Sequence, residues 1–281
     1  MSATINTNIA SMNAQRNTSA SQLSLTTSMQ RLSSGLRVNS AKDDAAGLAI
    51  SERMNAQVRG MNVAMRNAND GISMAQTAEG ALSKVTDALQ RMRELAVQSR
   101  NGTNSDSDKN SLNKEFQELQ KEINRVLGGT AFNGKKILGA DGTNFSFQVG
   151  ANTDAEDTIT VSFENMVSNT DMSAITVTTA SIGSTADMSA IASVIANIDT
   201  ALDTINDKRA TFGATQSRFE AVIANLQVAV ENQSAARSRI VDADFAVETA
   251  NLSRAQILQQ AGNAMIAQAN QLPQQVLRLL Q

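Results

Sequence analysis

Apolar residues recur every seven positions between about residues 43 and 100. The main series is Met54, Met61, Ala68, Ala75, Leu82, Leu89 and Ala96, and the alternate positions hold Val58, Met65 and Ile72. This heptad pattern is typical of a coiled-coil seam, so the segment is predicted to be one long helix. Ser40, with Asp43 three residues later, is the expected start, and Asn101-Gly102 is the expected end. Other long helices must lie beside such a helix to bury its seam.

Further patterns predict the partners of this helix. One helix is expected to end at Gly128-Gly129 and another to span about 187–239; their apolar faces are Leu112, Phe116, Leu119, Ile123, Val126 and Phe219, Val222, Leu226, Val230. Alternation predicts two hairpin strands, 145–149 and 159–163. A short strand is expected around Ile175–Val177 in an otherwise exposed stretch. The predicted fold class is mainly α, with long antiparallel helices in a coiled-coil bundle and a small β-hairpin region.

Both ends of the chain are patterned like helices and are nearly uncharged. The first acidic residue is Asp43, and Arg278 is the only charge after Arg254. Burying the apolar side chains of these ends returns less free energy than the backbone loses in conformational entropy when it becomes ordered. We therefore expect both ends to be disordered in a monomer and to fold on pairing with each other and with neighbouring subunits. The candidate assembly residues are Ile5, Ile9, Met12, Leu32, Leu36, Leu258, Met265, Leu272 and Leu279.

Side-chain size and polarity at the ends favour contacts between helices. Small residues allow close approach, and Asn and Gln supply uncharged hydrogen bonds; the small residues are Ala10, Ala14, Ala20, Ala261, Gly262, Ala264, Ala267 and Ala269. An alternative is that the ends are amphipathic helices on a membrane surface. Such helices usually carry polar faces rich in Lys and Arg, which residues 255–281 lack. Protein–protein contact is therefore the favoured interpretation.

The composition argues against several classes of function. The 281 residues include no His or Cys, so the usual general base, thiol nucleophile and common zinc ligands are missing. We expect no enzyme activity, metal or cofactor. A cation site is an alternative to a solvated acidic loop, although the spacing matches no EF-hand; its residues would be Asp106, Asp108, Asp154, Glu156 and Asp157. The net charge of −3 gives no argument for nucleic acid.

The sequence also bears on membranes and export. No apolar run approaches the roughly 18–20 residues that span a bilayer, so membrane insertion is not expected. The first residues, Met1-Ser2-Ala3-Thr4, do not have the pattern of a Sec-type signal peptide.

Two regions resemble the signatures of bacterial flagellins. Residues 5–8 (INTN) and 31–50 (RLSSGLRVNSAKDDAAGLAI) are similar to the N-terminal signature of that family. Residues 234–240 (SAARSRI), followed by Asp242 and Asp244, and residues 265–271 (MIAQANQ) are similar to the C-terminal signature. The resemblance covers about residues 1–150 and 190–281.

The resemblance implies a short filament subunit made of five segments. Residues 1–42 and 240–281 would be the two halves of an inner filament-core domain. Residues 43–164 and 190–239 would form a helical domain with the hairpin, and 165–189 would be a short exposed variable segment. The implied function is a structural subunit that assembles with itself into an extracellular helical filament and gives motility. A minor protein of the hook–filament junction, or an enzyme, is the competing interpretation.

The resemblance also implies partners. Flagellins are exported unfolded, with a chaperone on the C-terminal segment, and polymerise beneath a cap protein at the distal tip, beyond hook-junction proteins. Residues 89–98 are similar to a segment that a host Toll-like receptor recognises in some family members. Arg91, Leu95 and Glu115 fall on the family's receptor-contact positions. The alternative for these residues is a helix face that serves filament packing.

Overall fold

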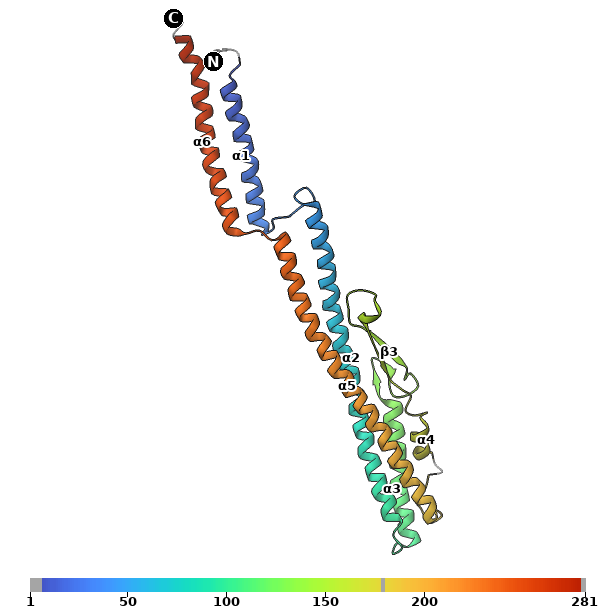
Figure 1. Cartoon of the computed structure of the whole chain (residues 1–281). Coiled ribbons are helices and arrows are strands. Elements are labelled where there is room, and N and C mark those ends of the chain that lie inside the picture. Colours follow the sequence, from blue (N-terminus) through green and yellow to red (C-terminus); the bar gives the residue numbers. More distant parts are fainter. Residues whose placement is uncertain (1–6, 178–179, 279–281) are drawn as a thin grey trace. The chain divides into compact units, whose positions relative to one another are not determined.

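The computed structural model describes residues 7–177 and 180–278, with the side-chain surroundings of all of these except 272–278. The chain divides into a terminal unit, Met1–Ala56 with Glu231–Gln281, and a central unit, Gln57–Val230. The α-helices are α1 Ile9–Ser34, α2 Ala45–Ser99, α3 Asp106–Gly129, α4 Thr170–Thr176, α5 Met188–Val241 and α6 Phe245–Arg278 (Figure 1). The shorter elements are β1 Ala131–Phe132, β2 Lys135–Lys136, β3 Asn144–Gln148, the 3-10 turn η1 Ala155–Asp157 and β4 Thr158–Ser162. The predicted fold class is confirmed.

Helix α2 begins at Ala45, one turn later than expected. The carboxylate of Asp43 accepts hydrogen bonds from the hydroxyl and the backbone N–H of Ser40, and these bonds lower the pKa of Asp43. Asp43 therefore closes a turn before the helix instead of lying within its first turn. Asp44 Oδ1 accepts a hydrogen bond from the Gly47 N–H at 2.8 Å and caps the helix.

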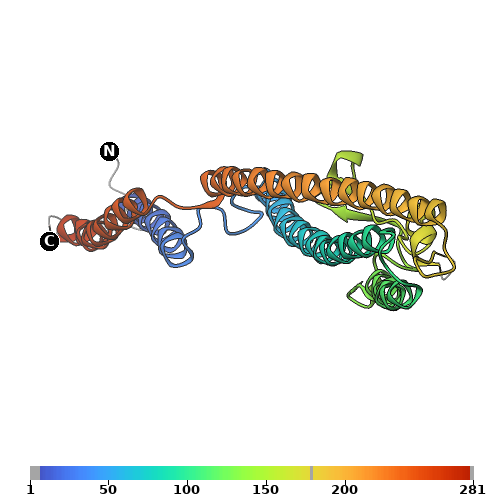
Figure 2. The ribbon, with the colours of Figure 1, turned by 90° about the horizontal axis from the view of Figure 1, so that it is seen from below.

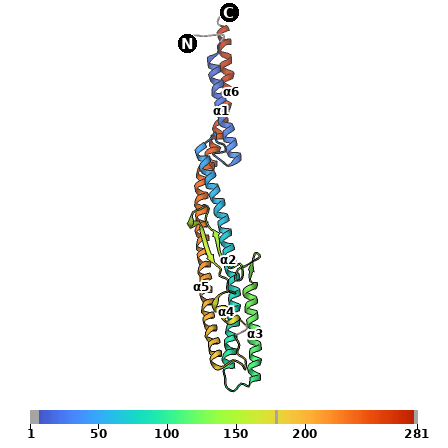
Figure 3. The ribbon, with the colours of Figure 1, turned by 90° about the vertical axis from the view of Figure 1, so that its right-hand side faces the viewer.

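Helix α2 runs between α5 and α3 in the central unit (Figures 2 and 3). From Ala68 to Ala96 the main series of the predicted heptad seam is buried, as are Val85 and Met92 beside it. The earlier members Met54 and Met61 are only half-buried. The seam therefore builds a core over the part of α2 that has neighbours on both sides.

The predicted hairpin is confirmed as an antiparallel pair of β3 and β4. The pairs in register are Asn144 with Ser162, Phe145 with Val161, Ser146 with Thr160, Phe147 with Ile159 and Gln148 with Thr158. Aromatic rings fix this hairpin to α5. Phe163 stacks on Phe212 at 5.1 Å between centroids, and Phe147 lies edge-on to Phe219 at 5.5 Å. A second, smaller antiparallel pair joins β1 and β2.

The strand expected around Ile175–Val177 is wrong. Residues Thr170–Thr176 form α4, which begins where Asn169 Oδ1 accepts hydrogen bonds from the first backbone N–H groups. Met172 and Ile175, three residues apart, are both fully buried. The helical spacing of these two side chains, anchored by the asparagine cap, overrides the β preference of the short Ile-Thr-Val run.

The expectation that the whole of 165–189 is exposed is also corrected. Side-chain amides of α3 hold this segment: Gln120 Nε2 donates to the carbonyls of Ile175 at 2.7 Å and Ala180 at 3.1 Å. Asn113 Oδ1 accepts a hydrogen bond from the Ile182 N–H at 2.9 Å, and Ile182 is fully buried. The amides satisfy backbone groups that would otherwise need water, so the segment can pack against α3.

Within the described residues, α5 is the one helix with the length and composition of a candidate membrane span. Three of its large apolar residues, Ile191, Ile198 and Ile205, are buried in the core of the central unit. Packing inside the protein therefore accounts for much of the apolar character of this helix.

A glycine on α2 sets how closely α5 packs. A Cβ on Gly71 would lie 2.7 Å from Cζ of Phe219, whose ring is fully buried. At Gly80, about two and a half turns further along the same helix, a Cβ would lie in open space. Glycine lowers helix stability at both positions through the same loss of backbone entropy on folding. Only at Gly71 does the missing Cβ make room for a neighbouring side chain, the ring of Phe219.

We predict opposite effects of alanine at these two glycines. Gly80→Ala should stabilise the protein by about 0.5–1 kcal/mol through helix propensity. Gly71→Ala gains the same propensity, but the overpacking against Phe219 costs about 1–3 kcal/mol, so it should be neutral to destabilising. Urea unfolding of the monomer, followed by far-UV circular dichroism, measures both. Equal stabilisation by the two variants would contradict this account of Gly71.

Candidate functional site

The terminal unit pairs α1 with α6 in antiparallel orientation (Figure 1). Asn8 Nδ2 donates a hydrogen bond to the Ala269 carbonyl at 2.8 Å, and Ser11 Oγ bonds to Asn270 Oδ1 at 2.8 Å. At the other end of the pair, Arg31 Nη1 lies 3.8 Å from Glu248 Oε1. The two ends of the sequence, which were expected to meet, therefore lie side by side along most of their length.

The residues between α1 and α6 follow a heptad spacing but are mostly small or polar. On α1 they are Ser11, Ala14, Thr18, Ser21, Leu25, Ser28 and Leu32, and on α6 they are Glu248, Leu252, Ala255, Gln259, Gly262, Ile266 and Ala269. We call this set the terminal seam. A Cβ on Gly262 would lie 2.4 Å from Thr18 Oγ1, so the helices approach closely there. Gln259 Nε2 donates a hydrogen bond to Gln22 Oε1 beside the seam.

Sequence reasoning found this seam only in part. Ala14, Gly262 and Ala269 were among the small residues expected between helices, and they lie in it. The other five small residues of that set are exposed: Ala10, Ala20, Ala261, Ala264 and Ala267. The missed signal was the seven-residue repeat of small residues at Ala255, Gly262 and Ala269, which large apolar residues at other positions obscured.

Four of the predicted assembly residues lie outside the terminal seam. Ile9 and Met12 of α1 are 70% and 60% exposed, and Leu258 and Met265 of α6 are 51% and 63% exposed. Other exposed large apolar residues of α1 and α6 are Leu23, Met29, Phe245, Val247 and Ile257. The unit therefore keeps mostly small and polar side chains in the terminal seam, while many of its large apolar side chains lie outside the seam and are exposed.

The remaining assembly candidates divide into two groups. Leu32 and Leu36 are half-buried; Leu32 belongs to the terminal seam, and Leu36 forms a β-bridge with Asp242 just beyond it. Ile5 and Leu279 lie outside the described residues, as does the side chain of Leu272.

The bridge at Leu36 ties together the connections that leave the helix pair. Gly35 ends α1 in a left-handed conformation with φ of 71°, which glycine adopts without steric cost. Its carbonyl accepts a hydrogen bond from the Ala243 N–H at 2.9 Å, and Val241 O accepts from the Arg37 N–H at 2.7 Å. The segment that follows α1 and the segment that precedes α6 are thus hydrogen-bonded to each other, and this bonding aligns α1 with α6.

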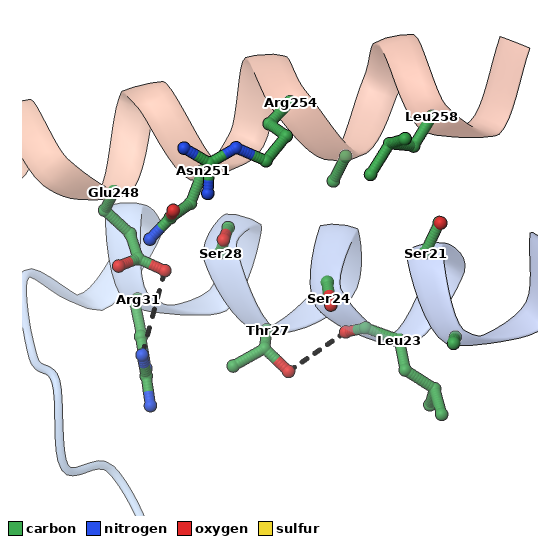
Figure 4. A pocket seen from close by; sticks show the side chains of 12 residues that line it. Ser21, Leu23, Ser24, Thr27, Ser28, Arg31, Glu248, Asn251, Arg254 and Leu258 are labelled. Carbon is green, nitrogen blue, oxygen red and sulfur yellow. Dashed lines mark hydrogen bonds and ion pairs between the residues drawn. The ribbon is translucent and has the colours of Figure 1, made fainter. Parts of the chain in front are cut away.

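A groove of about 560 Å³ follows one side of the α1–α6 pair. Figure 4 shows side chains of both helices along it: Leu23 and Leu258 at one end, and Arg31 beside Glu248 at the other. Ser24 and Ser28 line the α1 side between these ends, and Ser21 lies at the end that holds Leu23 and Leu258. The groove is apolar at one end and polar at the other, and no side chain of the pair itself fills it.

A second candidate surface lies on α2 and α3 of the central unit. Arg91 Nε donates a hydrogen bond to Glu115 Oε1 at 2.8 Å, and Nη1 of the same arginine lies 2.9 Å from Glu94 Oε2. Hydrogen bonding to Glu115 and Glu94 raises the pKa of Arg91. The Arg91 and Glu115 side chains remain about half exposed. The structure thus brings two of the three receptor candidates together on an accessible surface.

The third receptor candidate, Leu95, is not on that surface. Its side chain is fully buried in the core of the central unit. Leu95 therefore cannot contact a partner directly in this conformation, and it can only support the helix that presents Arg91.

Two of the acidic residues considered as a cation site, Asp108 and Asp157, accept hydrogen bonds from nearby backbone groups. Asp108 forms a capping box with Ser105, and its hydrogen bonds to that serine lower the pKa of Asp108. Asp157 Oδ2 accepts a hydrogen bond from the Asn152 N–H at 2.9 Å. Across the residues that the structure describes, no group of three or more acidic side chains is placed to hold a metal ion.

Comparison with known proteins gives consistent matches. The sequence matches the family model described as the bacterial flagellin N-terminal helical region over residues 5–143 and the model of the C-terminal helical region over residues 195–280. It is 48% identical over 276 residues to a flagellin of Halalkalibacterium halodurans, covering 98% of this chain and 99% of the relative. It is 46% identical to a flagellin of Xenorhabdus nematophila, with all of both chains covered. The crystal structure of Bacillus cereus flagellin is 33% identical, with 57% of this chain and 88% of that one covered and a TM-score of 0.49.

Proposed function

Because this chain belongs to the bacterial flagellin family and is therefore a structural subunit of the flagellar filament and not an enzyme, we propose that its terminal unit carries the main contacts between subunits. The filament is extracellular, and the principal partner of each subunit is another copy of the same chain. The assembly contacts would be the predicted set from Ile5 to Leu279, with the described members Ile9, Met12, Leu258 and Met265 at its centre.

One observation carries this proposal: many large apolar side chains of α1 and α6 lie outside the terminal seam and are exposed. Ile9, Met12, Leu258 and Met265 are each more than half exposed, although burying a side chain of this size stabilises a structure by roughly 1.5–3 kcal/mol. A neighbouring subunit can supply that burial. A head-to-tail contact that does not close generates a helical filament, in which every subunit repeats the same burial.

The scarcity of charge at both ends supports the same surface. An unpaired charge buried in a subunit contact is costly, and a filament repeats that cost in every copy. The Arg31–Glu248 pair lies near the end of the terminal seam where the chain leaves the helix pair. The rest of α6 after Arg254 has one charge, Arg278.

The weakness of the terminal seam also suits export. We propose that the subunit is secreted unfolded through the flagellar export channel, with a chaperone on its C-terminal segment. It would then meet hook-junction proteins at the base of the filament and the cap protein at its tip. Small and polar seam residues give α1 and α6 little stability as an isolated pair, so a chaperone or a neighbouring subunit can compete for their apolar faces.

We predict that Ile9→Gln combined with Leu258→Gln raises the concentration needed for filament formation by about tenfold or more. The two side chains are exposed in the subunit, so its own fold should remain intact while the intersubunit burial is lost. Sedimentation and electron microscopy after salt-induced polymerisation measure the change. Val177→Gln, an exposed valine at the end of α4, is the matched control and should polymerise normally.

A double variant that polymerises like the control would contradict the assignment of these contacts. Removal of residues 260–281 is a harsher form of the same test. It should abolish filaments while circular dichroism still reports the helices of the central unit.

We further propose that the subunit is recognised by a host Toll-like receptor through the surface around Arg91 and Glu115. The hydrogen-bonded pair is about half exposed and joins α2 to α3, which supports a contact surface of fixed geometry. Leu95 would act from the core by holding Arg91 in place. The same surface can also serve filament packing.

Replacing both Arg91 and Glu115 with alanine should reduce receptor signalling by monomer without unfolding it, because an exposed ion pair adds little to stability. Lys84→Ala with Asp87→Ala removes another exposed pair of α2 and is the matched control. A receptor reporter assay over a range of monomer concentrations makes the comparison. Signalling at wild-type strength by the Arg91/Glu115 variant would argue against this surface.

A further inference from the structure

Methionine is the main side chain of this protein that oxidants can modify. It contains 12 methionines but no Cys, Trp, Tyr or His. The methionine thioether is readily converted to a sulfoxide by peroxides, and reductases can reverse the change. In this protein the other side chains that commonly react with oxidants are missing, so methionine is the expected target.

The methionine side chains differ in how far they are exposed to solvent. Among the described residues, four are exposed: Met12 at 60%, Met29 at 57%, Met188 at 58% and Met265 at 63%. Those buried in the core of the central unit are Met74, Met92, Met166 and Met172, and the half-buried ones are Met54, Met61 and Met65. Three of the four exposed thioethers therefore belong to the terminal unit.

These three methionines border the terminal seam. Met12 follows Ser11 and Met29 follows Ser28 on α1, while Met265 precedes Ile266 on α6, and each of these neighbours is a seam residue. Their side chains are thus part of the outward-facing apolar surface of the helix pair. Met188, in contrast, begins α5 in the central unit.

We propose that Met12, Met29 and Met265 form an oxidation site through which peroxide blocks the incorporation of a subunit into the filament. This inference rests on the proposed assembly role of the terminal unit. It adds that oxidation of methionines on the contact surface controls assembly, and that it acts on subunits before they are incorporated.

The chemical step is a two-electron oxygen transfer from hydrogen peroxide. The thioether sulfur attacks one peroxide oxygen, a sulfur–oxygen bond forms and the oxygen–oxygen bond breaks. The leaving hydroxide takes the proton from the transferred oxygen and departs as water. The sulfur is oxidised to the sulfoxide and the peroxide is reduced, with no further reactant required.

The product is unsuited to a buried contact. A sulfoxide is polar and chiral, and its oxygen must accept a hydrogen bond to be buried without a large desolvation cost. Where the receiving surface of the neighbouring subunit is apolar, it offers no donor for this oxygen. In a finished filament the same side chains would be covered by neighbouring subunits and protected from the oxidant.

The test treats wild-type monomer with hydrogen peroxide and locates the added oxygens by peptide mass spectrometry. We expect Met12, Met29, Met265 and Met188 to react first, and the concentration needed for polymerisation to rise roughly tenfold or more once they have reacted. Methionine sulfoxide reductases should restore polymerisation. Protein oxidised after polymerisation should carry less sulfoxide at the three terminal positions than at Met188.

The triple variant Met12→Leu, Met29→Leu and Met265→Leu replaces each thioether with an alkyl side chain of similar volume. It is compared with itself: the concentration that it needs for polymerisation, whatever its value before treatment, should not rise after peroxide. Met188→Leu is the matched control and should remain sensitive. Equal loss of polymerisation in the triple variant and the wild type would overturn the proposal, as would normal polymerisation of wild type fully oxidised at the three positions. Failure of the untreated wild type to polymerise would instead overturn the assembly role, and this proposal with it.

Discussion

The helix pair α1–α6 depends on a seam of small and polar side chains. Gly262 lies against Thr18, and Ala255 and Ala269 continue the same row. Close backbone approach gives good van der Waals contact but buries little apolar area, so the pair gains little from its own interface. Several large side chains that could stabilise the pair, among them Ile9, Met12, Leu258 and Met265, are exposed instead. This division makes the terminal unit dependent on contacts beyond the single chain.

The central unit is built on the opposite arrangement. Leu82, Leu89 and Met92 of α2 are fully buried, and Phe163 stacks on Phe212 to fix the hairpin. Here most of the large apolar side chains point inward, and Gly71 makes room for the buried ring of Phe219. The central unit can therefore fold through its own contacts, whereas the terminal unit exposes apolar surface that neighbouring subunits can cover. A filament subunit needs both properties, since it must be a stable building block and must also add to a growing end.

The sequence predicted the central helices and the hairpin well because their large apolar residues coincide with the buried positions. It failed where small or polar residues carry the packing. In the terminal unit, the heptad of Leu258 and Met265 is visible in the sequence but lies beside the true seam. At 165–189, amides of Gln120 and Asn113 hold the backbone, and such side chains are indistinguishable from a solvated face in a single sequence. The burial of Leu95 was missed for the converse reason: its neighbours Arg91 and Glu94 are exposed on the same helix, whereas its own side chain is fully buried.

The central claim is that α1 and α6 become stable only when neighbouring subunits cover them. Amide hydrogen exchange, measured on dilute monomer and on filaments of the same protein, tests it most directly. The account predicts weak protection of residues 9–34 and 245–271 in the monomer, strong protection of the same residues in the filament, and strong protection of the central core in both. Strong protection of α1 and α6 in dilute monomer would contradict it.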